Sequence, residues 1–213
     1  IALLLIDVAG RPMNVLTPGF QSDLAECIQR VATDAAVRGV VIGSAKSSFM
    51  AGADIKDMVG AFDRGITAAE ASKFSYQLSS LLRRLETCGK PVAAAINGVA
   101  LGGGFELALA CHYRVIADEP KAGVGLPEVK IGLLPGGGGT QRVPRLVGVT
   151  EALKLITEGR QLSPADALKK GLVHELAPRD EIVERARQWI LKGGEGVQPW
   201  DKKGFRVPGG VGQ

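Results

Sequence analysis

Two glutamates beside glycine-rich turns are the residues of this sequence best suited to chemistry. Gly102-Gly103-Gly104 and Glu106 follow an apolar, β-compatible run at 91–96, and Phe105–Cys111 is typical of a helix. Glu128 lies further along, in a loop framed by glycine and proline. A strand, a glycine turn and a helix in this order leave backbone N–H groups at the helix start, where they can bind an oxygen that gains negative charge. Two carboxylates beside such a pocket can divide acid and base work.

Each of these features also has a purely structural interpretation. A glycine-rich turn is often only a tight turn, and a glutamate in a first helical turn stabilises the helix dipole by roughly 0.3–1 kcal/mol without any chemistry. Glu128 can equally be an exposed loop charge. Residue types alone leave both interpretations open, since a motif match is only a hypothesis.

A second small-residue loop precedes and includes Ala53. The run at 39–44 is expected to be a strand, and the loop at 49–55 follows it directly, at the end of the strand where ligands bind in open α/β sheets. Surface loops of this kind are also common without a function. If the loops around Ala53 and Gly103 meet, each can donate one backbone N–H to the same oxygen.

The order of predicted elements indicates an α/β protein. Amphipathic helices alternate with short apolar strands, which favours a sheet layered with helices. Thr67 and Glu70 form a capping box that opens one helix, and Asp180 is expected to cap the last one. Strands are expected at 1–7, 39–44, 91–96, 112–117 and 172–176, and the main helices at 18–37, 67–88, 105–111, 150–158, 163–171 and 180–191. The inward face of the helix after Thr67 is expected to carry Phe74, Leu78, Leu81, Leu82 and Leu85.

The composition indicates a globular domain and gives no sign of nucleic-acid binding. The 213 residues are 46% apolar and 23% charged, with a net charge of +4 spread along the chain and few aromatics. A basic stripe or an aromatic platform for nucleic acid is absent from the sequence. A mild positive balance suits an anionic small molecule.

Apolar runs and cysteines predict a cytoplasmic protein without a membrane span. The run at 1–6 is too short to cross a bilayer and lacks the basic residues of a signal peptide, and the apolar tract at 92–111 is interrupted by glycines and Glu106. Cys27, Cys88 and Cys111 form no CxxC, which predicts reduced, buried thiols. The missing initiator Met suggests a piece of a longer protein.

Nucleotide and metal motifs are incomplete in this sequence. Gly136–Gly139 with Thr140 look like a phosphate loop, but the lysine of GxxxxGK[ST] is missing, and no suitable GxGxxG opens a helix. His174-Glu175 lacks the second histidine of HExxH, so a zinc hydrolase is not supported. We therefore predict no metal site.

Three motifs in order resemble one known family. FMAGADIKDM (49–58), INGVALGGGFELALACHYRVIAD (96–118) and GLPEVKIGLLPGGGGTQRVPRLVG (125–148) are similar to the enoyl-CoA hydratase/isomerase family, the crotonases. The resemblance covers about residues 1–191 and is far more specific than a lone glycine loop. The third motif and the closing PWDKKGFRVPGG are most similar to the α subunits of multifunctional fatty-acid oxidation complexes, in which a 3-hydroxyacyl-CoA dehydrogenase region follows. The resemblance thus implies a hydratase domain at 1–191 and a loosely structured linker at 192–213, toward an absent dehydrogenase region.

The resemblance also implies a fold and a set of site residues. The fold is the ClpP/crotonase-like spiral of ββα units, whose C-terminal helical cover would be truncated here. Glu106 and Glu128 match the catalytic glutamates, and the N–H groups of Ala53 and Gly103 match the oxyanion hole. Gly136 matches the residue that positions water, and the CoA-binding loop is matched by Ala51, Gly52, Asp54 and Ile55.

The implied activity is hydration of trans-2-enoyl-CoA to 3-hydroxyacyl-CoA in fatty-acid β-oxidation. The presence of both glutamates favours a hydratase, with Δ3-Δ2 isomerase activity left open. CoA is part of the substrate, and no cofactor is implied. Expected partners are the acyl-CoA thioester and either a second copy of the chain or, in the full-length protein, a thiolase β subunit. The alternative is a CoA-thioester-binding domain that is inactive as a fragment. A Clp-like serine protease lacks its Ser/His pair.

Overall fold

A five-stranded parallel sheet forms the centre of the molecule. The computed structural model describes residues 1–210, without the side chains of Ile55 and Asp57. The strand order is β1-β2-β3-β5-β8, and all four neighbouring pairs run parallel. These strands are β1 (Ala2–Ile6), β2 (Val40–Ser44), β3 (Val92–Ile96), β5 (Tyr113–Ala117) and β8 (Glu175–Ala177). Every residue of β3 is buried, as expected for a parallel strand covered on both faces.

A second, smaller sheet carries the segments that matter for the site. It consists of β4 (Val99–Leu101), β6 (Gly123–Gly125) and β7 (Gln161–Leu162). β4 and β6 are parallel, with Leu101 opposite Gly125, and β6 and β7 are antiparallel. Because β4 follows β3 after a two-residue break at Asn97-Gly98, the chain passes directly from the large sheet into the small one.

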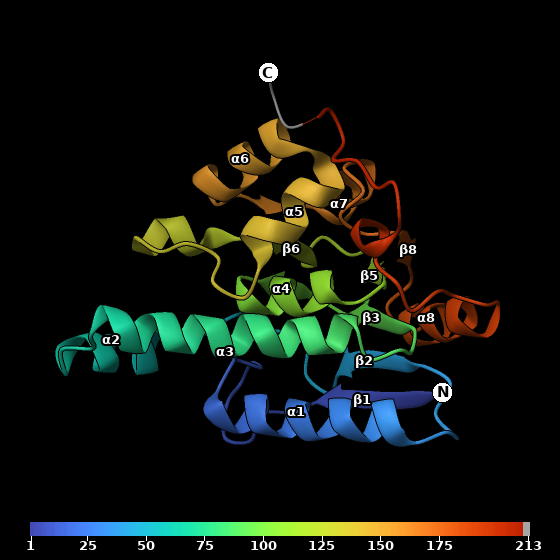
Figure 1. The fold of residues 1–213 in the computed structure, drawn as a ribbon, viewed down its shortest axis with the longest axis horizontal. Helices are drawn as coiled ribbons and strands as arrows, with labels where there is room; N and C mark the ends of the chain where they lie inside the picture. The colour runs from blue at the N-terminus through green and yellow to red at the C-terminus, as the bar shows by residue number, and fades with distance from the viewer. Residues whose placement is uncertain (211–213) are drawn as a thin grey trace.

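Helices surround the two sheets. Figure 1 shows α3 crossing the middle of the molecule, with α1 below it and α5, α6 and α7 above it. α8 packs against β2, β3 and β5, whereas α3 contacts both α1 and α4. The helices are α1 (Pro18–Thr33), α2 (Ile55–Asp63), α3 (Ala68–Glu86), α4 (Gly103–Ala110), α5 (Gly139–Val147), α6 (Val149–Glu158), α7 (Pro164–Lys169) and α8 (Ile182–Leu191), with 3-10 turns η1 (Pro127–Ile131) and η2 (Pro199–Asp201).

α4 is the buried helix around which the site is built. All eight of its residues are buried, and Glu106 is the only charged one. A helix that is apolar on all sides is stable only inside a protein, where α3, α5 and β4 enclose this one. The catalytic candidate Glu106 is therefore held on a rigid element.

Most predicted elements are confirmed, and four local predictions are wrong. α1 ends at Thr33 instead of Val37, since Asp34 adopts an extended backbone. The last strand begins at Glu175 instead of Leu172, and α8 starts after Glu181 with no side-chain cap from Asp180. The Thr67–Glu70 capping box forms as predicted.

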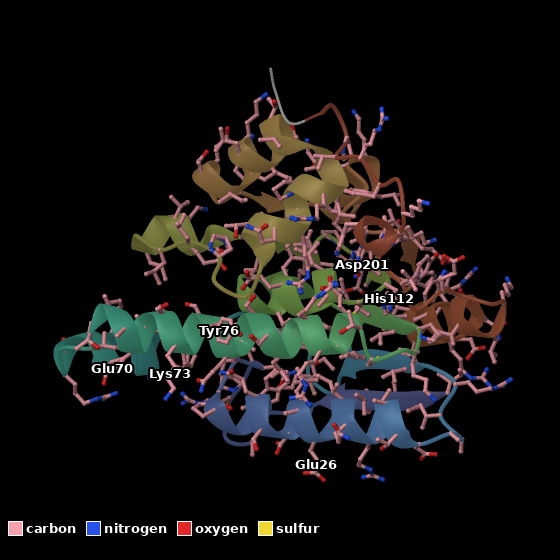
Figure 2. The ribbon with its side chains drawn as sticks, viewed as in Figure 1. Glu26, Glu70, Lys73, Tyr76, His112 and Asp201 are labelled. Atoms are coloured by element: carbon pink, nitrogen blue, oxygen red, sulfur yellow. The ribbon has the colours of Figure 1, made fainter. Side chains whose placement is uncertain are left out.

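The fourth wrong prediction concerns the orientation of Phe74. It was expected to face inward, but it is 43% exposed, and Tyr76 is 73% exposed (Figure 2). Leu78, Leu81, Leu82 and Leu85 are buried as expected. Figure 1 shows that α2 and the first half of α3 extend beyond the sheets, so this part of α3 does not lie on the central core.

Residues 192–210 are more ordered than the expected linker. They include the turn η2, and Gln198 is buried against the end of α4, where its Nε2 donates to the carbonyl groups of Leu109, Ala110 and Cys111. Asp201 accepts two hydrogen bonds from Arg83 of α3. The expectation of loose structure is thus wrong for this segment, while a further region beyond it stays a prediction.

The prediction of buried thiols is confirmed for Cys111 and is wrong for Cys27 and Cys88. All three cysteines are free, but only Cys111 is buried, and Cys27 and Cys88 are half-buried.

Within residues 1–210, none of the helices combines the length and the apolar character that a bilayer crossing requires.

Candidate active site

β4 brings together three loops that are far apart in the sequence. On one side, the N–H of Leu101 donates to the carbonyl of Met50 at 3.0 Å. On the other side, the N–H of Gly102 donates to the carbonyl of Gly125 at 2.9 Å. The loop at 50–54, the start of α4 and the loop leading to Glu128 therefore converge at the end of this one short strand.

The two predicted oxyanion-hole amides lie in adjacent loops. Gly103 is the first residue of α4, so its N–H has no partner within the helix. In the part of the chain that the structure describes, neither this N–H nor that of Ala53 donates a hydrogen bond. Gly52, with φ at +89°, approaches so closely that a Cβ there would lie 3.5 Å from the nitrogen of Gly103. The two donors are thus available at one place.

Asn14 anchors the loop that carries Ala53, and sequence reasoning missed it. Its side chain is fully buried, and its Nδ2 donates to the carbonyls of Ile6 and Phe49 and to the hydroxyl of Ser44. The backbone carbonyl of Asn14 accepts the N–H of Ala51 at 2.9 Å. An asparagine in an irregular segment carries no local signal for such a role.

Glu106 lies in a cradle made by the glycine cluster after Pro135. Its side chain is 2% exposed, and the N–H of Gly139, the first residue of α5, donates to its Oε1 at 2.7 Å. A carboxylate at a helix N-terminus is stabilised by the free N–H groups and the helix dipole. Burial raises the pKa of Glu106, and the amides of Gly139, Gly137 and Gly138 and the charge of Arg142 oppose that rise.

Glu128 faces the start of α4 from η1. Its Oε1 lies 3.0 Å from where a Cβ of Gly102 would be, a tight approach, and Gly102 has φ at +52°, which favours glycine at this place. Its Oε2 is buried without a hydrogen-bond partner among the described residues. Burial, together with the nearby charge of Glu106, raises the pKa of Glu128 to about 7.

The two carboxyl groups therefore flank one place. Glu106 Oε2 lies 3.8 Å from the Cβ position of Gly103, and Glu128 Oε1 contacts that of Gly102, the residue before it. One group is held by amides and the other has an unpartnered oxygen and a pKa near neutrality. Two carboxyl groups in unequal environments can serve as base and acid beside amides that stabilise an oxyanion.

Comparison with known proteins gives this arrangement its family. The sequence pattern described as "Enoyl-CoA hydratase/isomerase" matches residues 2–195. The chain belongs to the enoyl-CoA hydratase/isomerase family. The pattern spans both glutamates and both amide loops, and the crotonase-like fold follows from it and from the solved structures below.

Subunits of fatty acid oxidation complexes are similar in sequence to this member of the family. The fatty acid oxidation complex subunit alpha of Shewanella sp. (strain ANA-3) is 45% identical over 203 residues, which is 95% of this chain and 28% of that protein. The same subunit of Shewanella loihica is 47% identical over 194 residues, or 91% of this chain and 27% of that protein. The chain thus spans little more than a quarter of the length of these relatives.

Solved structures share the fold. An enoyl-CoA hydratase from Bacillus anthracis is 35% identical with a TM-score of 0.75, over 84% of this chain and 67% of that one. Pseudomonas aeruginosa DspI is 30% identical with a TM-score of 0.80, over 89% of this chain and 75% of that one.

The other site residues predicted for this hydratase/isomerase domain lie near the same loops. Asp54 is buried, pairs with Arg11 at 2.7 Å and accepts the N–H of Lys56, so it closes the loop of Ala51 and Gly52 at the start of α2. The side chain of Ile55 lies outside the described residues. The CoA-binding role of this loop stays a prediction.

Gly136, the predicted water-positioning residue, is exposed. A Cβ there would lie 3.0 Å from the hydroxyl of Ser75 in α3. The structure places the neighbouring Gly137–Gly139 around Glu106 instead, so the glycine cluster holds the carboxyl group as well as bordering the site. The role of Gly136 with water stays a prediction.

A surface hollow lies away from these residues. Its volume is about 800 Å³, and it is lined by Asp118, Glu119 and Leu176–Asp180, at the carboxyl ends of β5 and β8. It contains none of the predicted site residues. The residues predicted for the site therefore gather around α4 and not at this hollow.

Proposed function

We propose that this domain hydrates trans-2-enoyl-CoA thioesters to 3-hydroxyacyl-CoA. The observation that carries the proposal is a pair of carboxyl groups, of buried Glu106 and half-buried Glu128, that flank the amide at the start of α4; Glu128 Oε2 has no partner among the described residues. Family membership supports the substrate class, and relatives named for fatty acid oxidation support a place in that process.

In the proposed reaction, the thioester oxygen accepts hydrogen bonds from the N–H groups of Ala53 and Gly103. Polarisation of the carbonyl makes C3 electrophilic, and Glu106 takes a proton from water as the water oxygen bonds to C3. The C2–C3 π electrons move toward the thioester oxygen, where the two N–H donors stabilise the negative charge. Glu128 then gives its proton to C2, and a proton passed back from Glu106 to Glu128 through solvent restores the site.

The charge states support this assignment. Burial raises the pKa of Glu106, and the amides of Gly137–Gly139 oppose that rise by binding the ionised form that a base requires. A pKa of about 7 leaves a share of Glu128 protonated at neutral pH, as an acid requires. No metal or redox cofactor enters this chemistry, and CoA arrives as part of the substrate. The same two groups could move a proton between C2 and C4, which leaves an isomerase activity open.

The test is hydration of crotonyl-CoA, followed by loss of the absorbance of the conjugated thioester. Glu106→Gln and Glu128→Gln should each lower kcat by about 10²–10⁴-fold, the usual worth of a general acid or base. Glu26→Gln, on the exposed side of α1 (Figure 2), should leave kcat unchanged. CoA-thioester binding without turnover would favour the silent binding domain instead. Equal rates in all variants would refute both carboxyl roles.

A further inference from the structure

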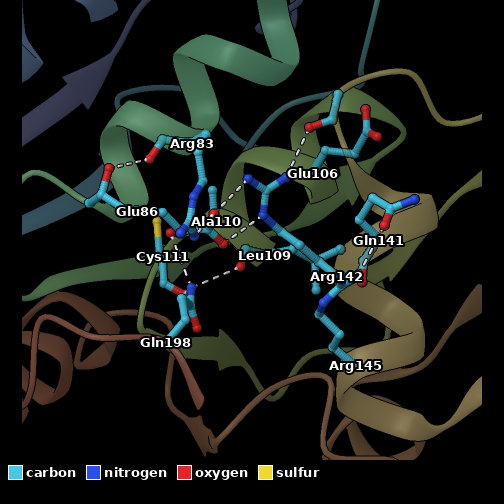
Figure 3. A network of polar contacts seen from close by, with 12 residues as sticks. Arg83, Glu86, Glu106, Leu109, Ala110, Cys111, Gln141, Arg142, Arg145 and Gln198 are labelled. Atoms are coloured by element: carbon cyan, nitrogen blue, oxygen red, sulfur yellow. Dashed lines mark hydrogen bonds and ion pairs between the residues drawn. The ribbon is translucent and has the colours of Figure 1, made fainter. Parts of the chain in front are cut away.

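A buried ion pair lies directly behind the loop that holds Glu106. Arg142 of α5 donates from Nε and Nη2 to the two carboxylate oxygens of Glu86 of α3, at 2.7 and 3.0 Å (Figure 3). Their exposed fractions are 5% and 2%. Burying two charges costs so much solvation that such a pair rarely stabilises a fold better than apolar residues of the same size. Its place beside a reactive carboxyl group therefore needs another explanation.

The same guanidinium group holds the glycine loop. Its Nη1 donates to the carbonyl of Gly137 at 2.9 Å. Gly138 has φ at +110°, and a Cβ there would lie 2.3 Å from this Nη1, so the loop and the arginine fit only because no side chain intervenes. The next amide, that of Gly139, donates to Glu106. A continuous set of contacts thus runs from Glu86 through Arg142 and the glycine loop to Glu106.

Glu86 is itself fixed from two other sides. Arg83 donates from Nη1 to its Oε2 at 3.1 Å. Its backbone carbonyl lies 3.0 Å from Nε2 of His112, whose Nδ1 accepts the N–H of Val92. His112 therefore donates from Nε2, and burial lowers its pKa, so its ring is neutral. The carboxylate of Glu86 is held in one orientation toward Arg142.

We propose that Glu86 and Arg142 are positioning residues for Glu106. The pair Glu86–Arg142, which we call the brace, holds the amides of the 137–139 loop against the carboxylate of Glu106. It thereby keeps that carboxylate aimed at the water that Glu106 deprotonates. Neither residue touches the reacting atoms. This inference rests on the proposed hydratase function, because it assigns the brace to the base of that reaction.

The brace also sets the charge that Glu106 meets. The charged groups around Glu106 are Glu128 from η1 and Arg142 from α5, with Glu86 and Arg83 of α3 behind Arg142. The positive charge of Arg142 lowers the pKa of Glu106, and Glu86 neutralises part of that charge. Removing the charge of Arg142 should therefore raise the pKa of Glu106, and removing the charge of Glu86 should lower it. A merely structural pair would not produce these opposite shifts.

The experiment compares Arg142→Gln, Glu86→Gln and Arg145→Gln in the crotonyl-CoA assay across pH. Arg142→Gln should lower kcat by up to about 10²-fold with a much smaller change in KM, since misplacement of a catalytic group costs about this much. The acid limb of its kcat–pH profile should move to higher pH, and the acid limb for Glu86→Gln should move to lower pH. Arg145, one turn along α5, bonds to Gln141 at the surface, so Arg145→Gln should match the wild type.

A lysine variant separates charge from geometry. Arg142→Lys keeps the charge but lacks the planar fork that binds Glu86 and Gly137 at once. We expect it to restore the acid limb of the pH profile while kcat stays reduced. If Arg142→Gln does not fold by circular dichroism, Arg142→Lys against Arg145→Lys decides the question.

The outcomes keep the two proposals apart. If the wild type turns over and Glu106→Gln does not, but Arg142→Gln matches Arg145→Gln, the brace is refuted and the hydratase stands. If the wild type does not turn over, the hydratase proposal fails, and carbon-13 NMR titration of the Glu106 carboxyl group still reports the brace. Opposite shifts of that titration in Arg142→Gln and Glu86→Gln support it, and unchanged titration overturns it.

Discussion

Ionising Glu128 is costly because one of its oxygens is buried without a hydrogen-bond partner in the described chain. Glu106, which is more deeply buried, is held by the amides of Gly137–Gly139, whereas the backbone contact of Glu128 comes from its own residue. The difference comes from single residues: Gly139 donates to one carboxyl group, while Gly102 merely leaves space for the other. An unsatisfied carboxyl group lowers the stability of the folded protein, and such destabilising groups are typical of active sites.

The cost at Glu128 should appear as a pH-dependent stability. Its pKa is raised from 4.5 to about 7, so the folded state keeps a proton that the unfolded chain releases. Its contribution is present below pH 4.5 and is lost as the pH rises through about 7. Thermal unfolding should therefore show Glu128→Gln gaining Tm over the wild type as the pH rises from 4.5 to above 7.

Glu26→Gln provides the baseline for that series, because Glu26 is exposed. Its Tm difference from the wild type should be nearly the same at each pH. A Tm difference for Glu128→Gln that is equally flat would show that the carboxyl group titrates normally.

At the scale of elements, α4 can serve the site only because it lies very close to the loop at 50–53. A Cβ on Gly104 would lie 2.4 Å from the carbonyl oxygen of Met50 and 2.7 Å from its Cβ. That carbonyl also accepts the N–H of Leu101, so neither partner is free to move. Close approach of helix and loop brings the loop of Ala53 beside the start of α4, as the proposed oxyanion hole requires.

Gly104→Ala should separate these two elements. We expect a loss of about 1–3 kcal/mol in the free energy of unfolding, as for other overpacked cores, together with a fall in kcat. Urea unfolding and the hydration assay measure the two effects. Gly19→Ala in α1 is the matched control, since its Cβ would meet only Thr17 Oγ1, at 3.8 Å, and alanine favours a helix by up to about 1 kcal/mol. Equal stabilities of the two variants would contradict the close contact.

At the scale of the whole molecule, the segment after α8 returns to the centre of the fold. Gln198 donates to three carbonyl groups at the end of α4 (Figure 3), and Asp201 binds Arg83, the neighbour of Glu86 in the brace. Helix ends leave carbonyl groups without partners, and a buried end needs a donor from elsewhere. The far end of α4 is thus closed by Gln198, which is 89 positions away from Leu109.

Gln198→Ala should destabilise the protein by about 1–3 kcal/mol, because buried carbonyl groups lose their donor. Chemical denaturation measures this loss. Gln77→Ala, at an exposed position of α3, should change stability by less than about 0.5 kcal/mol. If both variants unfold at the same denaturant concentration, the closing segment does not support α4.

The sequence by itself determined the local parts of this protein: the strand, glycine turn and buried helix at 92–110, the capping box at Thr67, and the two glutamates as candidates. These depend on periodicity and on turn residues within a few positions, and the motif order indicated the family. Only the tertiary structure decided that Glu86 pairs with Arg142 across 56 positions, that Asn14 anchors the Ala53 loop, and that Phe74 is exposed. Such contacts arise when separate elements pack, and the free energy of a buried polar group depends on neighbours that no local pattern specifies.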